Sequence, residues 1–405
     1  MKTFKNKHKE KINEKKIKLI GFISFLLGFA QALLVYVESS YFKSSIGSEN
    51  VSLFYFIAYA VVLVGLLNMH KIIHVLGRST AFFLFFFLQI CSIALLIFFP
   101  PSYFGVFLLM AYIVVSYLTL VVLDIILESY SEDRKSGRIR GMHLMIINVG
   151  FLFGPYLSAQ LLQAYSYYGL FLVSMLINMF IFIVGLIGLR ESNNRFVENL
   201  TVRDLMHKIF INKDLMRIYW ISFVLEFFYA LMVMYTPLYL LDLGFDWGRI
   251  GIIFTFMLLP FVLFGYPAGI IADKKMGEKE MLIVGIGIMA ISTASIFFIS
   301  SKSLLLWAGI LFVTRIGAAL IETLRDSYFY KKIDARDMDV ISFFRTSRSA
   351  AYLVATSFSA LILFFLSVKA VFLFVALVVF AALYPAFKLV DNKSEKELEY
   401  SPERI

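Results

Sequence analysis

Twelve runs of about 20 apolar residues occupy almost the whole of this 405-residue chain. A helix of about 20 residues, rising 1.5 Å per residue, crosses the roughly 30 Å of hydrocarbon in a bilayer. The composition agrees, since 60% of the residues are hydrophobic, 16% are charged and the mean hydropathy is +0.82. A soluble domain cannot bury so much apolar surface. The sequence therefore predicts an all-α membrane protein with twelve transmembrane helices, at residues 19–42, 51–69, 79–99, 104–127, 140–164, 169–189, 218–241, 249–272, 281–299, 303–324, 340–367 and 370–389.

The distribution of positive charge predicts the orientation of these helices. Most of the 38 Lys and Arg residues lie in the two tails and in every second connection, whereas Lys43, Arg249, Lys302 and Lys369 lie on the opposite side. Positive residues stay on the cytoplasmic side during insertion. We therefore expect a multi-pass protein of the cell (inner) membrane with both termini in the cytoplasm. This topology accounts for the net charge of +10 without nucleic-acid binding. An alternative role for the basic tail is contact with anionic lipid.

A polar stretch at residues 190–217 divides six predicted helices from six others. The predicted units are a basic tail at 1–18, a first bundle at 19–189, the central loop at 190–217, a second bundle at 218–389 and a tail at 390–405. The sequence also repeats itself after 198 residues. This shift places Asp124, Glu128, Ser129 and Tyr130 on Glu322, Asp326, Ser327 and Tyr328, and Tyr41 on Tyr239. The repeat predicts two pseudo-symmetric bundles of six helices.

Small residues form a regular pattern in the predicted helix at 140–164, at Gly141, Gly150, Gly154 and Pro155. Gly150 and Gly154 lie on one helical face and allow a neighbouring backbone to approach closely, while Pro155 permits a bend. The alternative is ordinary packing of small residues.

Another pattern follows the predicted helix at 249–272 and comprises Gly269, Asp273, Lys274, Gly277 and Lys279.

These two patterns resemble motifs of the major facilitator superfamily. The pattern at 141–155 is similar to the fifth-helix motif of its proton antiporters, although Ser158 and Ala159 replace the final pair of glycines. The pattern at 269–279 resembles the family's loop motif with one extra residue before Gly277, and the first half has His74 where that motif has an acid. The resemblance implies transport of a small-molecule substrate, a cavity lined by helices 1, 4, 7 and 10 of the fold, and a gating role for Asp273.

Two charges within predicted spans are the leading candidates for a substrate and proton site. Arg315 and Glu226 both lie about 12 Å from the cytoplasmic boundary at the standard helical rise. A charge at such a depth is costly and indicates function. The resemblance implies that the two face each other across the cavity, and the alternative is a static ion pair between their helices. Weaker candidates for the same cavity are Gln31, Glu38, Tyr229 and Tyr235, of which Tyr235 is alternatively an interface anchor.

A further group of charges is expected at the cytoplasmic ends of the helices. Asp124 and Glu322 lie about 20 residues, near 30 Å, from the outer ends of their helices. We expect such charges to form networks that hold the two halves together and break when the protein opens. The alternative is that they are solvated helix ends. The same level holds Glu128, Asp326, Arg325, Arg345 and Arg348.

Other residue patterns exclude several classes of function. His70 and His74 have the spacing of a metal pair, but no further ligand completes the set, so we expect no metal site. His143 is expected to contact lipid headgroups or the fourth helix, and Cys91 to pack in the core. No phosphate-binding glycine loop and no clustered catalytic residues are present, so we expect neither ATP-driven transport nor an enzyme, and no cofactor.

The sequence therefore predicts a secondary transporter that works by alternating access. Protons are the expected coupling ion, with Glu226 as the proton-responsive group and Arg315 as its partner or as an anion contact. The fifth-helix motif favours efflux of a small hydrophobic or amphipathic solute by a monomer embedded in lipid. Alternatives are uptake by a symporter or uniporter, and a lipid flippase, since the helices are rich in Phe.

Overall fold

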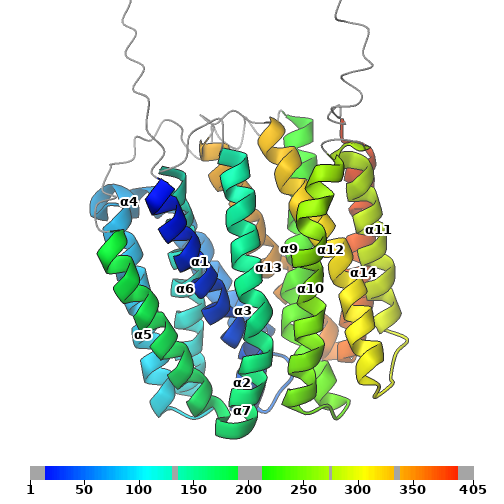
Figure 1. Cartoon of the computed structure of the whole chain (residues 1–405). Coiled ribbons are helices and arrows are strands. Elements are labelled where there is room, and N and C mark those ends of the chain that lie inside the picture. The colour runs from blue at the N-terminus through cyan, green and yellow to red at the C-terminus, as the bar shows by residue number, and fades with distance from the viewer. Residues whose placement is uncertain (1–13, 130–135, 190–211, 273–275, 333–337, 391–405) are drawn as a thin grey trace, which may run out of the picture.

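The computed structural model describes residues 14–129, 136–189, 212–272, 276–332 and 338–390, and within these ranges the chain is helical without strands (Figure 1). The first part holds α1 (Glu14–Val35), α2 (Glu38–Ile46), α3 (Ser52–Leu67), α4 (Met69–Leu76), α5 (Arg78–Phe98), α6 (Tyr103–Ser129) and α7 (Ser136–Gly188). The second holds α9 (Lys213–Asp242), α10 (Trp247–Ile271), α11 (Glu278–Ile296), α12 (Leu304–Lys332), α13 (Met338–Phe365), α14 (Val368–Ala381) and α15 (Leu383–Phe387).

Ten helices of the described chain are long and apolar enough to cross a membrane. One of them, α7, contains two spans, because the chain turns back within it (Figure 1). Two helices are joined at Ser166, whose φ of 54° and ψ of −162° are not helical. The shorter apolar helix α3 supplies a further span. These elements account for the twelve predicted transmembrane segments, and the fold class predicted from the sequence is confirmed.

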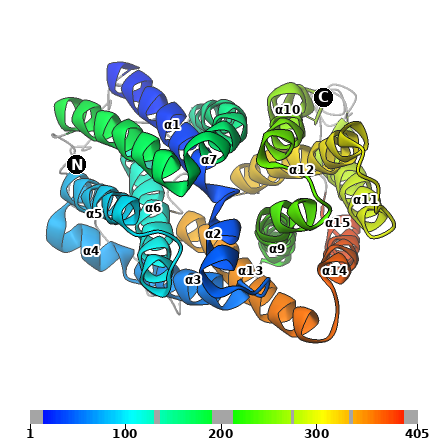
Figure 2. The same ribbon diagram turned by 90° about the horizontal axis from the view of Figure 1, so that it is seen from below.

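The helices form two groups that lie side by side, α1–α7 and α9–α15 (Figure 2). Contacts between the groups run along two seams, one between α7 and α10 and the other between α3 and α13. The first helix begins and the last one ends at the same end of the molecule, the top in Figure 1, which we call the termini end. The other end is called the far end.

Matching contacts in the two halves support the predicted repeat. The Tyr41 hydroxyl donates to the Phe99 and Pro100 carbonyls at 3.4 Å each, and the Tyr239 hydroxyl donates to the Ile299 carbonyl at 3.0 Å. In each half the acceptor lies just after the third long helix, α5 or α11.

The glycines that precede those third helices also match. Gly77 has φ 81° and ψ 159°, and Gly277 has φ 79° and ψ 165°. Side chains are excluded from this backbone conformation, so both connections need glycine. The two halves therefore use the same turn into the third helix.

The glycines of α7 lie against α1 as their spacing predicts. A Cβ atom on Gly150 would lie 2.2 Å from the Phe25 carbonyl oxygen, and one on Gly154 would lie 2.2 Å from the Ala32 Cβ. The two backbones therefore touch at these positions. Gly141 belongs to α7, but its surroundings lie outside what the structure describes.

Candidate functional site

One cavity of about 360 Å³ lies between the two halves, and both contribute to its walls. Its lining comes from α1, α2, α3, α6 and α7 on one side and from α9, α10, α12 and α13 on the other. The ionisable residues that line it are Glu38, Asp124, His143, Glu226, Arg315, Glu322, Arg325, Asp326, Arg345 and Arg348. Its aromatic residues are Tyr36, Tyr59, Tyr112, Tyr117, Phe151, Tyr229, Phe261, Phe344 and Tyr352. Such a mixture of charge and aromatic surface is typical of a ligand site.

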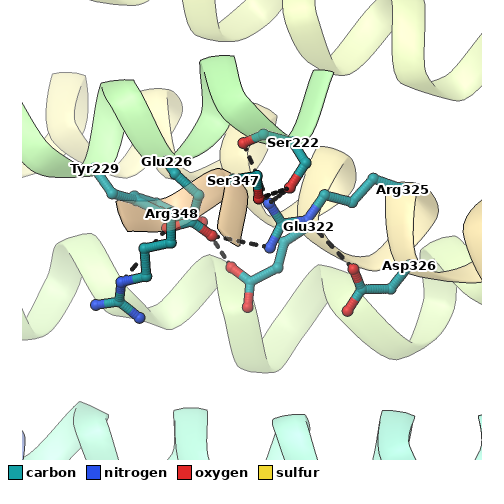
Figure 3. Close-up of polar contacts among 8 residues, drawn as sticks. All are labelled: Ser222, Glu226, Tyr229, Glu322, Arg325, Asp326, Ser347 and Arg348. Carbon is teal, nitrogen blue, oxygen red and sulfur yellow. Dashed lines mark hydrogen bonds and ion pairs between the residues drawn. The ribbon is translucent and has the colours of Figure 1, made fainter. Parts of the chain in front are cut away.

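Glu226 on α9 is the centre of a polar network in the second half (Figure 3). Its carboxylate lies 3.1 Å from Arg325 Nη2 and 3.7 Å from Arg348 Nε. Arg325 also contacts Asp326 at 3.3 Å and donates to the Ser222 hydroxyl at 2.8 Å. These contacts join α9, α12 and α13.

The predicted pairing of Glu226 with Arg315 is therefore wrong. The predicted tenth span ends at residue 324, but α12 continues as a helix to Lys332. Arg325 consequently lies inside the helix, where its side chain reaches Glu226. The charged residues past position 324 line a cavity and do not mark the end of the helix.

Arg315 is buried without an ionic partner among the described residues, and 2% of its surface is exposed. Its guanidinium carbon lies 4.9 Å from the ring centre of Phe228 and 5.4 Å from that of Tyr229. Its Nε and Nη1 groups have no hydrogen-bond acceptor, and it forms no ion pair with any residue that the structure describes.

Two more carboxylates of the cavity have contrasting surroundings. Glu322 on α12 accepts a hydrogen bond of 2.6 Å from the Tyr229 hydroxyl. Glu38, the first residue of α2, is 9% exposed and accepts a longer hydrogen bond, of 3.5 Å, from the Tyr55 hydroxyl. Glu38 forms no ion pair within the described ranges.

Asp124 on α6 connects the two halves near the termini end. Its carboxylate lies 3.2 Å from Arg345 Nη2 on α13 and 3.2 Å from His143 Nε2 on α7. The other ring nitrogen of His143 lies 3.2 Å from the Ser24 hydroxyl on α1. His143 thus contacts the fourth span, α6, as expected. Among the predicted gating charges, Asp124 and Arg345 meet across the halves, whereas Arg348 pairs with Glu226 within its own half.

The remaining predicted residues divide between the cavity, the far end and positions that the structure does not describe. Gln31 lines the cavity. Tyr235 lies outside it, fully buried, with its hydroxyl 2.5 Å from Ser52 of the other half. It is therefore neither a cavity residue nor a lipid anchor. Asp273 and the Glu128 side chain lie outside the described residues.

The far end of the cavity is closed by contacts that sequence analysis missed. Lys43 Nζ at the end of α2 lies 2.7 Å from Asp242 at the end of α9 and 3.2 Å from Glu49. We call these three residues the latch. Burial and the nearby Asp242 carboxylate raise the pKa of Glu49, because two acids share one lysine. The signal in the sequence was Lys43 itself, one of few cations on that side.

Polar side chains beside the latch also form hydrogen bonds between the two halves. The Ser52 hydroxyl lies 3.0 Å from that of Ser359, and Asn50 Nδ2 donates to the Ala360 carbonyl at 3.4 Å. Deeper between the halves, the rings of Tyr59 and Tyr352 stack with centres 3.8 Å apart. The cavity is thus sealed from the far end and extends toward the termini end, where Asp124, Asp326 and Arg345 line it.

Solved structures share this arrangement of helices. One is a POT family transporter, PepTSo, with a TM-score of 0.71, 12% sequence identity, and coverage of 92% of this chain and 97% of that one. Another is an auto-inhibited POT family peptide transporter, with a TM-score of 0.72, 12% identity, and coverage of 96% and 100%. The human organic anion transporter MFSD10 (TETRAN) has a TM-score of 0.67, 15% identity, and coverage of 93% and 100%. At these identities the likeness shows the fold.

A comparison with curated proteins finds no match to this sequence. The model of the Major Facilitator Superfamily, in contrast, matches residues 20–336 and 248–404. These two matched ranges together cover nearly the whole chain, including every helix that lines the cavity. With two six-helix halves around one central cavity, the chain belongs to the Major Facilitator Superfamily of membrane transporters.

Proposed function

We propose that this transporter is a secondary active carrier that works by alternating access and exchanges a small amphipathic solute for protons. The observation that carries the proposal is the cavity between the halves, which the latch closes at one end. A carrier of this kind exposes one site to each side in turn. The positive residues favour a cytoplasmic termini end. We therefore propose that the cavity belongs to an inward-facing state, in which Asp124 and Arg345 still join the halves, and that the carrier acts as a monomer.

The contacts around the cavity suggest which carboxylate takes up the proton. Protonation of Glu226 would weaken its ion pairs with Arg325 and Arg348. Glu38 can accept a proton without breaking any ion pair of the described chain, because its hydrogen-bond donor is a tyrosine hydroxyl. We therefore assign proton coupling to Glu38 in place of Glu226, and we assign to Glu226 the role of holding the second half in its inward-facing arrangement.

The direction of transport rests on the glycine motif of α7, which resembles that of proton antiporters and favours efflux. Uptake by symport or uniport is the second candidate, since the same cavity would serve either direction. A lipid flippase is the third candidate, because the charged walls of the cavity could also accommodate a polar headgroup.

Purified protein in proteoliposomes tests proton coupling and direction together. With a solute that stabilises the protein against heat, an inward proton gradient should drive outward movement, and reversal of the gradient should reverse it. Glu38→Gln should abolish gradient-driven flux while leaving solute exchange measurable. Glu280→Gln, an exposed acid at the start of α11, is the matched control and should behave as wild type. Normal gradient-driven flux in Glu38→Gln would refute the assignment.

A further inference from the structure

Arg315 differs from the other three arginines of the cavity in having no anionic partner. Arg325, Arg345 and Arg348 lie 3.1, 3.2 and 3.7 Å from a carboxylate oxygen. Arg315 is more deeply buried than any of them, yet its Nε and Nη1 groups lack an acceptor among the described residues. Buried polar groups are almost always hydrogen-bonded, so an unpartnered guanidinium on a cavity wall requires an explanation.

The aromatic contacts of Arg315 do not provide that explanation. A charge buried within a membrane is costly, and a cation over an aromatic ring recovers only part of that cost. The rings of Phe228 and Tyr229, near the guanidinium carbon, can offset part of this cost. They leave Nε and Nη1 without a hydrogen-bond acceptor among the described residues.

We infer that Arg315 binds the carboxylate of the substrate, and that the substrate is a small organic monoanion with an apolar or aromatic body. This inference rests on the proposed transport function. The guanidinium fork matches a carboxylate through two parallel hydrogen bonds. Arg315 Nε and Nη1 are buried in this structure, so we infer that the side chain turns toward the cavity when the carboxylate binds. One unpaired cation balances one negative charge.

The walls beside Arg315 fit the apolar body of such a substrate. Tyr229 and Phe261 line the cavity from the second half and Tyr36 from the first, with Val233 and Leu258 beside them. An aromatic carboxylate could therefore place its charge on Arg315 and its ring among these side chains.

Three probes of similar shape and different charge test the inference by thermal unfolding of the purified full chain. These probes are phenylacetate, 2-phenylethylamine and 2-phenylethanol. Phenylacetate at millimolar concentration should raise the apparent Tm of the wild type by at least about 1 °C, and the other two should not. Arg315→Gln should lose this shift, and Arg315→Lys, which keeps the charge without the fork, should keep part of it. Arg249→Gln, at an exposed arginine in another ion pair, is the control and should keep all of it.

Several outcomes would overturn the inference. They are an equal shift with the amine or the alcohol, an equal shift of Arg315→Gln with phenylacetate, or no shift of the wild type with phenylacetate. Because a misfolded Arg315→Gln would also lose the shift, its elution as a single folded species is checked first, and Arg315→Lys supplies a second comparison. Stabilisation by phenylacetate without any flux in proteoliposomes would preserve the anion site and contradict the transport function instead.

Discussion

Arg325 is the residue on which the charge network of the second half depends. Its guanidinium contacts both Glu226 and Asp326, and its side chain is 10% exposed, as is that of Glu226. Removal of one partner from a buried ion pair strands the other charge. We therefore expect Arg325→Ala to lower the free energy of unfolding by about 3 kcal/mol, measured by chemical unfolding in mixed micelles.

A matched control for Arg325→Ala is available at the surface. Arg249 pairs with Asp246 at 3.4 Å, but these side chains are 60% and 53% exposed. Solvent screens such a pair, so Arg249→Ala should cost between about 0 and 1 kcal/mol. Equal losses in the two variants would show that the Arg325 network contributes no more than a surface ion pair.

At the residue scale, the sequence identified the charges of the site but not their partners. Depth along a helix can be counted from the sequence, and this count assigned Glu226 and Arg315 to one level of a cavity that both residues line. Pairing depends also on which way each side chain points, and the count contains no such information. Arginine side chains are long, so Arg325 reaches Glu226 whereas Arg315 turns to the Phe228 ring.

The contact between α1 and α7 depends on two glycines. Gly150→Ala would place a methyl group 2.2 Å from the Phe25 carbonyl oxygen, and Gly154→Ala would place one 2.2 Å from the Ala32 Cβ. Both distances lie far inside van der Waals contact, so α7 must move away from α1. We expect each variant to insert in the membrane but to lose most transport activity, measured as solute flux in proteoliposomes.

A glycine without neighbours provides the control for these variants. A Cβ atom on Gly287 of α11 would meet nothing within 4 Å. Gly287→Ala should therefore transport normally. If Gly150→Ala and Gly154→Ala also transport normally, the glycines of α7 serve ordinary packing, and the fifth-helix motif no longer supports efflux.

At the element scale, apolar runs predicted the helices well and their charged ends poorly. Hydrophobicity reports burial, either in lipid or between helices as in most of α9, so the positions of the spans followed from the sequence. Helix ends that line a cavity carry charges and resemble loops. For this reason the predicted span stopped at residue 324, although the helix α12 continues to Lys332. Likewise α2 was merged with α1, although Tyr36 and Val37 separate them.

At the scale of the whole molecule, the repeat could be predicted because each half carries its own copy of the pattern. The conformation could not, since it depends on contacts between residues far apart in sequence. Lys43 and Asp242 are 199 positions apart, and neither lies in a motif. The sequence contains the charges for closure at both ends, and only the structure shows that the far end is closed.

If the molecule works by alternating access, the latch must open in each cycle. We predict that a covalent link between positions 43 and 242 stops transport, because it holds the halves together at the far end. Cys91 is the only cysteine, so Lys43→Cys and Asp242→Cys can be introduced with Cys91→Ser and joined by a short bifunctional maleimide. Solute flux should fall to background. A stabilising solute should still enter the cavity from the termini end, bind, and raise the apparent Tm.

Each single-cysteine variant, treated with the same reagent, controls for the loss of the latch charges. Undiminished flux in the linked protein would show that transport does not require the far end to open.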